Sequence, residues 1–153
     1  MTQENTPPVG TDAMDRVIWA LRQAEQTLQT LKEQRLRPLG MASAHYALLI
    51  SIRTHPGITG AELARRLNVT PQSVASLVAR LSDKGQLERR THPRHRHVRE
   101  LHLTDAGRQA LHASDSVIAT IEDRITARLG PEDTARFTAM LGEVVDAVRD
   151  TQS

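Results

Sequence analysis

The sequence contains no cysteine, and that single absence removes several kinds of chemistry. A chain of 153 residues without a thiol forms no disulfide, no thiolate metal site, no cysteine nucleophile and no thiol redox sensor. Aromatic residues are nearly as scarce, since Trp19, Tyr46 and Phe137 are the only three. Rows of aromatic side chains on which single-stranded bases stack are therefore not expected.

Long apolar runs are also missing. No stretch approaches the roughly 18 apolar residues that predict a transmembrane helix. The N-terminus, MTQENTPPVGTD, lacks the basic start and apolar core of a signal peptide, and residues 1–11 read as a disordered tail. The composition, 39% hydrophobic and 25% charged, is that of an ordinary globular domain. We therefore expect a soluble, cytoplasmic protein that does not contact membranes.

The net charge of +2 is unevenly distributed along the chain. Nine basic and four acidic residues fall between Thr59 and Leu103, which gives this segment +5 and leaves −3 for the rest. Four of the seven histidines lie in the same segment. A basic middle between neutral or acidic flanks indicates that a polyanion binds there. A solvated basic surface is the alternative.

The two ends of the chain have helical patterns. Apolar residues recur at three- and four-residue steps over Asp12–Leu36, Asp105–Leu129 and Glu132–Arg149, which predicts three long helices. Their apolar stripes are wider than one neighbouring helix could cover. We therefore expect residues 12–36 and 105–150 to form the interface of a homodimer.

Residues 41–104 carry the signals of a helix-turn-helix. After a helix over Ala42–Arg53, Thr59-Gly60-Ala61-Glu62 matches a capping box, in which the threonine and glutamate side chains satisfy free amides at a helix start. A short helix to Leu67 follows, and Asn68 suits a left-handed turn residue. Thr70-Pro71 begins the next helix with a hydroxyl cap and a proline at the first position. About three residues separate the two helices, which is the helix-turn-helix spacing.

A β wing is predicted after Gly85. Gln86–Arg90 and Val98–Leu103 read as two short strands, and the basic loop Thr91–His97, THPRHRH, joins them. The expected fold class is therefore mainly α: a winged helix-turn-helix core with a small antiparallel β wing of two or three strands, flanked by long dimerisation helices.

The second helix of such a unit enters the major groove of double-stranded DNA, and the residues at its N-terminus reach base edges. Gln72 can bond adenine bidentately, and serine can address several bases. The threonine caps suit phosphate oxygens. Two helices that merely pack together would explain the caps but not the basic loop. The residues expected to contact DNA are Thr59, Thr70, Pro71, Gln72, Ser73, Ser76, Arg80, Arg90, Arg94, Arg96 and His97.

The wing loop contains two cations that suit a minor groove. A narrow, A·T-rich groove concentrates negative potential and favours an inserted Arg94 or Arg96 guanidinium, with a solvated loop as the alternative. His92, His95 and His97 could instead suggest a metal site, but histidines on a loop without cysteine make a weak cage. We expect no metal and no cofactor, and interpret the histidines as a source of pH-dependent positive charge.

Residues 59–107, TGAELARRLNVTPQSVASLVARLSDKGQLERRTHPRHRHVRELHLTDAG, resemble the core of MarR-family transcriptional regulators. The combination of LARRLNVTPQSVASLVARLSDKG, an arginine-rich strand and LTDAG carries the resemblance, and the helical order extends it from about Asp12 to Asp150. It implies a homodimer of winged-helix subunits that binds a pseudo-palindromic operator. It also implies repression in most cases, and release by a small, often aromatic or phenolic acid.

The wing departs from the family pattern. The family usually reads Asp-x-Arg six residues before the Leu of LT, and counting back from Leu103 places His95 at the aspartate and His97 at the arginine. Arg96 lies one residue early, so it would supply the minor-groove guanidinium only through a one-residue shift or bulge.

Effector residues are suggested by the family's usual ligand site between the first two helices and the winged unit. Candidates on those helices are Arg16, Trp19, His45 and Tyr46, which offer a cation, flat apolar faces and hydrogen-bonding tips. Alternatively, Trp19 and Tyr46 simply pack in the core or in the dimer interface.

The sequence also bears on three other classes of function. An enzyme is not expected, because Ser43 and His45 and the carboxylates of the last helices lack catalytic spacing, and no glycine loop could cradle a phosphate. An architectural DNA-binding protein without a ligand, and a protein-interaction module, remain alternatives. DNA binding should weaken steeply with salt, whereas a protein interface should not.

Overall fold

The computed structural model describes residues 16–151, so the expected tail at residues 1–11 and the expected helix start at Asp12 lie outside the described part. None of the helices within residues 16–151 is long and apolar enough to span a bilayer. In chain order the elements are α2 (Val17–Leu36), η1 (Arg37–Leu39), α3 (Ser43–Thr54), α4 (Gly60–Leu67), α5 (Pro71–Asp83), β1 (Leu87–Thr91), β2 (Arg99–Leu103), α6 (Asp105–Leu129) and α7 (Pro131–Asp150).

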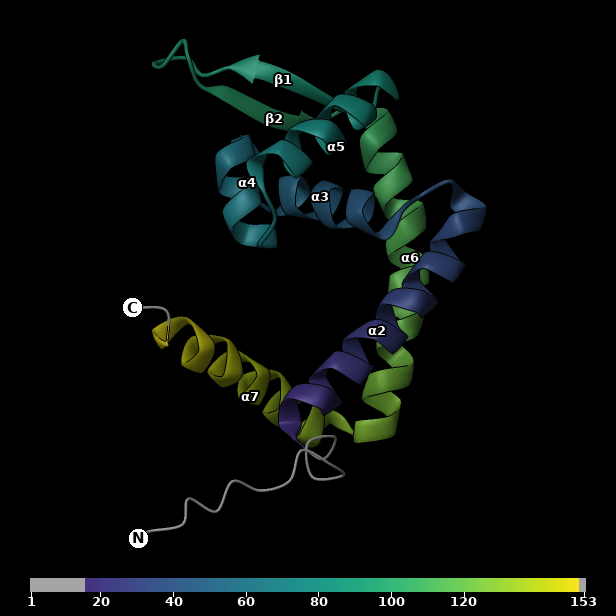
Figure 1. Cartoon of the computed structure of the whole chain (residues 1–153). Coiled ribbons are helices and arrows are strands. Elements are labelled where there is room, and N and C mark those ends of the chain that lie inside the picture. Colours follow the sequence, from purple (N-terminus) through teal and green to yellow (C-terminus); the bar gives the residue numbers. More distant parts are fainter. Residues whose placement is uncertain (1–15, 152–153) are drawn as a thin grey trace, which may run out of the picture.

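The elements form two parts. The winged body comprises α3, α4, α5 and the β1–β2 hairpin, and the long helical stem comprises α2 and α6. Helices α3, α4 and α5 and the β1–β2 hairpin gather at one end of α6, while α2 runs beside α6 (Figure 1). α7 leaves the other end of α6, the helix that it mainly packs against. This arrangement confirms the expected fold class, mainly α with a small antiparallel wing.

The wing is an antiparallel ladder of two strands. Leu87 pairs with Leu103 at its base and Thr91 with Arg99 at its far end, with every intervening pair in register. An isolated bridge between Thr59 and Glu100 lies in the position of a third strand. The ladder therefore contains no bulge, and any displacement of the wing arginines arises in the loop beyond Thr91.

Most boundaries lie within one residue of the sequence-based prediction. Each strand starts one residue later than expected, at Leu87 and Arg99. The last helix begins at Pro131 rather than Glu132, because the N–H that proline lacks would have no partner at the first helical position. Gly130, with φ of 82°, separates it from α6.

The core of the winged body is built around α3. Its Leu48, Leu49 and Ile52 side chains are almost completely buried, and α3 contacts α4, α5, β2 and α6. The outer helices contribute Leu36 from α2 and Leu111 from α6, which are equally buried. The other buried apolar residues of this cluster are Met41, Ile58, Leu63, Ala64, Val74, Val78, Leu81, Leu87, Leu101 and Leu103.

Side-chain caps define the helix starts of the helix-turn-helix. The predicted capping box is confirmed: the Thr59 hydroxyl accepts from the Glu62 N–H at 3.2 Å, and the Thr59 N–H donates to the Glu62 carboxylate at 2.9 Å. The Thr70 hydroxyl caps α5 by accepting from the Ser73 N–H at 3.1 Å. Between the helices, Asn68 adopts the expected left-handed conformation with φ of 53°.

The start of α6 lies against the strand entering the wing. The Thr104 N–H donates to the carbonyl oxygen of Gln86 at 3.2 Å, and the Thr104 hydroxyl accepts from the Gly107 N–H at 3.1 Å. A Cβ atom on Gly107 would lie 1.8 Å from that same Gln86 carbonyl oxygen. Only glycine therefore allows α6 to begin so close to β1.

Gly107→Ala should destabilise the protein by about 1–3 kcal/mol, because the new methyl group clashes with backbone that cannot rotate away. Gly60→Ala is the matched control, since its Cβ would meet only Val74 at 3.9 Å. Urea unfolding of both variants at one protein concentration measures the difference. Equal stability of the two variants would show that the contact is not as close as described.

Candidate nucleic-acid interface

One face of α5 is exposed along the whole helix. Gln72, Ser76 and Arg80, four residues apart, lie on this face, whereas Val74 and Val78 point into the core. Because a helix turns once in 3.6 residues, this spacing aligns the three polar side chains in one stripe. The stripe has the chemistry of a surface that reads base edges: an amide, a hydroxyl and a guanidinium.

The N-terminus of α5 is exposed and capped. The Thr70 and Ser73 hydroxyls lie 2.8 Å apart in a hydrogen bond, and Pro71 is exposed in the first turn. The positive end of the helix dipole therefore lies at a surface with two hydroxyl groups, which suits a phosphate.

Thr59 lies at the equivalent N-cap position of α4, where its backbone N–H and its side chain both form hydrogen bonds with Glu62. The backbone hydrogen bond from Thr59 lowers the pKa of the Glu62 carboxyl, and the side-chain hydrogen bond adds to this. Glu62 thus stays ionised, and its charge is directed at the α4 start. Thr59 is half-buried, and its N–H is already donated to Glu62.

The wing carries a row of arginines with different partners. Arg90 forms an ion pair with Glu88, and Arg99 donates to the Thr91 hydroxyl. Arg94 and Arg96, in the exposed loop between the strands, make no ion pair with any residue in the range 16–151. These two guanidinium groups are consequently available for a phosphate or a groove.

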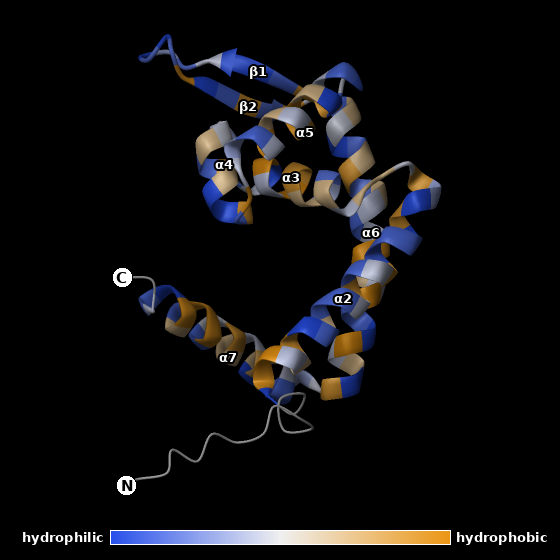
Figure 2. Cartoon of the chain, in the orientation of Figure 1, coloured by the Kyte–Doolittle hydropathy of each residue, from blue (hydrophilic) through white to orange (hydrophobic). Residues whose placement is uncertain are grey.

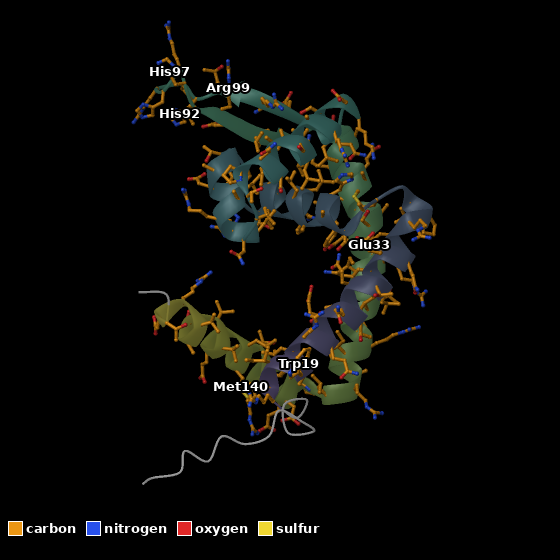
Figure 3. The ribbon with its side chains drawn as sticks, viewed as in Figure 1. Trp19, Glu33, His92, His97, Arg99 and Met140 are labelled. Carbon is orange, nitrogen blue, oxygen red and sulfur yellow. The ribbon has the colours of Figure 1, made fainter. Side chains whose placement is uncertain are left out.

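His97 lies at the tip of the same loop and is exposed (Figure 3). His92, in contrast, folds back beside Glu100 of β2, with 3.6 Å between Nε2 and Oε1. Across the described chain, no three histidine or carboxylate side chains are grouped so that they could hold a metal ion.

Hydrophilic residues dominate the wing, whereas α7 carries an apolar stripe (Figure 2).

The expected effector residues lie in two separate places. His45 and Tyr46 are in the first turn of α3, next to the end of α2, where the Ser43 N–H donates to Glu33 at 3.1 Å. Arg16 and Trp19 are at the beginning of α2. Trp19 is about 21 Å from Glu33 along the helix axis, at 1.5 Å per residue. The structure does not bring the four residues together within one chain.

The surroundings of Trp19 are solvent-exposed. Its side chain is 39% exposed, and the Arg22 guanidinium lies 5.7 Å from the centre of its ring. Within the described chain, Trp19 is therefore a surface residue rather than part of the core.

His45 is the most unusual polar residue at the junction of α2 and α3. Only 8% exposed, it has a buried Nδ1 atom without a hydrogen-bond partner in the described structure. Burial lowers the pKa of His45, the charges of Lys84 and Arg80 lower it further, and Glu33 opposes them. The neutral ring is therefore favoured, and its buried Nδ1 is a hydrogen-bonding atom with no partner among the described residues.

Three polar residues near His45 have no individual signal in the sequence. The Ser43 hydroxyl donates to the Gln29 side chain at 3.3 Å, and the Gln29 amide donates to Glu33 at 3.3 Å. Gln29 and Glu33 are four residues apart on α2, which places them on one face, but their approach to Ser43 depends on how α3 packs. Packing, rather than spacing, creates this polar junction.

Tyr46 joins α3 to α6. Its hydroxyl donates to the Asp115 carboxylate at 2.7 Å, and burial, followed by this hydrogen bond, raises the pKa of Tyr46. The neutral phenol is therefore the form that the fold requires.

An exposed polar stripe on the second helix of a helix-turn-helix, beside a cationic wing, defines a winged-helix DNA-binding protein. A model of the MarR family matches residues 39–96. The chain is also 30% identical, over 106 residues, to the HTH-type transcriptional repressor Rv2887 of Mycobacterium tuberculosis, an alignment that covers 69% of this chain and 76% of that protein. The chain belongs to the MarR family of transcriptional regulators, which are not enzymes.

Solved structures of the family have the same fold. The transcriptional repressor CouR, bound to a 23-mer DNA duplex, superposes with a TM-score of 0.81 at 23% identity, over 92% of this chain and 99% of that one. Rv2887 of Mycobacterium tuberculosis, in complex with salicylic acid, superposes with a TM-score of 0.67 at 26% identity, over 84% and 96%.

Tyr46 allows a direct test of the α3–α6 junction, because it is the only tyrosine in the chain. Phenolate absorbance should appear only above the ordinary value of about pH 10. Since folding raises this pKa, the associated stability is complete below about pH 10 and is lost as pH rises through the folded value.

Asp115→Asn should move phenolate formation to lower pH but not back to that of the urea-unfolded protein, because burial remains the larger cause. An alkaline absorbance titration of both proteins measures this. If phenolate absorbance in the folded wild-type protein appeared at the same pH as in the urea-unfolded protein, the buried contact would be contradicted.

Proposed function

We propose that this protein is a homodimeric transcriptional repressor that binds a pseudo-palindromic operator in double-stranded DNA and is released by a small, possibly aromatic, acid. The observation that carries the proposal is that the winged body presents both the exposed stripe of Gln72, Ser76 and Arg80 and a wing loop with the unpaired guanidinium groups of Arg94 and Arg96. A polar helix stripe and a basic wing loop on one body fit a major groove and a neighbouring minor groove.

The proposed contacts divide into three kinds. Pro71, Gln72, Ser73 and Ser76 reach base edges in the major groove, where the three polar side chains can form hydrogen bonds. Arg94, Arg96 and His97 approach the minor groove or its phosphates. Thr59, Thr70 and Arg90 contact the phosphate backbone and set the position of the protein on the duplex, and Arg80 contacts a phosphate or the groove edge.

A homodimer would cover apolar surface that one chain leaves in water. α7 exposes Phe137, Met140, Val145 and Val148, the last by 55%. An apolar groove of about 490 Å³ also runs between α2 and α6, with Leu28, Leu31, Ile121 and Ile125 among its lining residues. Apolar stripes on monomers are seldom left exposed on this scale. Residues 12–36 and 105–150 are therefore proposed as the dimerisation region, with residues 41–104 as the DNA-binding region.

The proposed effector site is the junction at which α2 meets α3. His45, with its unpaired buried nitrogen, and Tyr46 lie there, and the salicylic acid complex of Rv2887 supports an aromatic acid as the ligand class. Arg16 and Trp19 remain candidates only through a second copy of the chain, which would have to bring the start of its α2 to this junction. A ligand there would contact both the stem and the helix on which the winged body is built.

Gln72→Ala should reduce affinity for the operator by about 1–3 kcal/mol per half-site and relax the preference at one base pair. The duplex to test is one that the wild-type protein selects from a random-sequence library. Gln109→Ala, an exposed glutamine in α6, is the matched control and should bind normally.

Affinities for selected and random duplexes, at several salt concentrations, separate the outcomes. Equal loss on both duplexes would assign Gln72 to the DNA backbone. Binding that does not weaken with salt would contradict DNA recognition by this basic surface.

Val144→Asp should convert the protein to a monomer, because it places a carboxylate in the middle of the α7 apolar stripe, where burial of a charge is costly. Ala139→Asp makes a comparable change on the opposite face of α7 and should leave the dimer intact. Sedimentation equilibrium at micromolar concentration distinguishes them. A wild-type protein that sediments as a stable monomer would end the dimer proposal.

A further inference from the structure

The loop at the end of the wing is folded around one side chain. Nδ1 of His92 accepts hydrogen bonds from the backbone N–H groups of Arg94 at 3.1 Å and His95 at 3.2 Å. The backbone closes the same loop, because the His92 N–H donates to Val98 O at 3.0 Å and the Val98 N–H to His95 O at 2.9 Å. The backbone on either side of the wing arginines is thus tied to His92.

Turns of this kind are usually folded by aspartate or asparagine, whose oxygen accepts from N–H groups two or three residues later. Here an imidazole does so. Pro93 follows His92 and has no N–H, so the first two amides that His92 can reach are those of Arg94 and His95.

These contacts specify the protonation state of the ring. A ring nitrogen accepts a hydrogen bond only when it carries no proton. Since Nδ1 faces two N–H donors, the proton of the neutral ring is on Nε2, which lies 3.6 Å from Glu100 Oε1. The His95 ring stacks on His92, with 5.0 Å between centroids.

We propose that His92 is a positioning residue for DNA binding: its neutral ring holds the wing loop in the shape that presents Arg94 and Arg96, and protonation of Nδ1 releases the loop. The proposal rests on the proposed function, in which the wing contacts DNA. In this proposal, the His92 side chain accepts the hydrogen bonds that close the turn. Position 95 of the same wing is also a histidine.

The Glu100 carboxylate and the loop amides lie on opposite sides of the His92 ring. The Glu100 carboxylate lies against Nε2, and its other oxygen is 3.1 Å from His102 Nε2. Glu100 therefore attracts a charged His92 ring from the Nε2 side, while a proton on Nδ1 is repelled by the two loop amides. On the same strand as Glu100, the Arg99 guanidinium donates to the Thr91 hydroxyl. Gly57, packed behind Glu100 and His102, has no side chain to titrate.

The sign of the pH effect separates His92 from an ordinary basic histidine. A histidine that contacts only phosphate should strengthen DNA binding when it is charged. His92 should act in the opposite direction, because the loop loses its acceptor when the ring is protonated. An asparagine side-chain oxygen at position 92 can accept hydrogen bonds from the same two N–H groups, and its charge does not change with pH.

The test compares wild type, His92→Asn and His92→Ala, with His97→Ala as a matched control from the same loop. Affinity for the duplex that wild type selects at about pH 8 is measured at about pH 8 and about pH 5.5, the ends of the range in which imidazoles titrate, at constant ionic strength. Nitrogen–proton NMR spectra of the DNA-free proteins follow the Arg94 and His95 amides over the same range.

At about pH 8, His92→Asn should bind within about twofold of wild type. His92→Ala should bind roughly tenfold more weakly, since two hydrogen bonds to the loop are lost. At about pH 5.5, wild type should lose roughly tenfold relative to His92→Asn. His97→Ala should keep this loss, and the two wild-type amides should shift together as the ring titrates.

Two results would overturn the proposal while leaving the proposed function intact: His92→Ala binding like wild type at both pH values, or wild type and His92→Asn showing one common pH dependence. The proposal is also overturned if the NMR signals of the Arg94 and His95 amides change neither with the substitution nor with pH. This result does not depend on DNA binding. A wild-type protein that selects no duplex at any pH instead contradicts the proposed function, and the NMR measurement still decides whether His92 folds the loop.

Discussion

The burial of one face of α3 is the constraint on which the rest of the structure depends. Leu48, Leu49 and Ile52 are nearly inaccessible to solvent, and the helix that carries them touches α4, α5, β2 and α6. Apolar burial is non-directional. However, because four elements pack tightly against one helix, the position of each element is fixed by the others. The polar face of α5 and the wing are therefore positioned by the same core, to which α5 contributes Val74, Val78 and Leu81 and the wing strands contribute Leu87, Leu101 and Leu103.

The same helix links the winged body to the stem through polar contacts. At its first turn, the Ser43 N–H reaches Glu33 of α2, and the Tyr46 hydroxyl reaches Asp115 of α6. Partly buried hydrogen bonds to carboxylates are stronger and more directional than apolar contacts, so they specify how α3 is oriented on the stem. A ligand at His45 would bind beside these contacts, where small displacements can alter the angle between stem and winged body.

The loop at the end of the wing follows a different design, because most of its residues are exposed. The ladder of the wing is regular, but beyond Thr91 the loop is held by hydrogen bonds to His92 rather than by a core. Loops of this kind open at low free-energy cost, which makes them sensitive to the loss of one acceptor. The cationic groups that this loop presents are consequently under the control of a neighbour that does not itself need to touch DNA.

Local signals in the sequence were sufficient to predict most of this protein. Helix periodicity, the capping box at Thr59, the hydroxyl cap at Thr70 and the left-handed residue at Asn68 each depend on residues a few positions apart, so they can be recognised without knowledge of packing. Only the tertiary structure decided which distant residues meet. Tyr46 and Asp115 are 69 positions apart, and the α2–α3 packing separates Trp19 from His45. The acceptor role of His92 was equally hidden, because THPRHRH displays charge in its letters but not the loop geometry that turns one imidazole toward two amides.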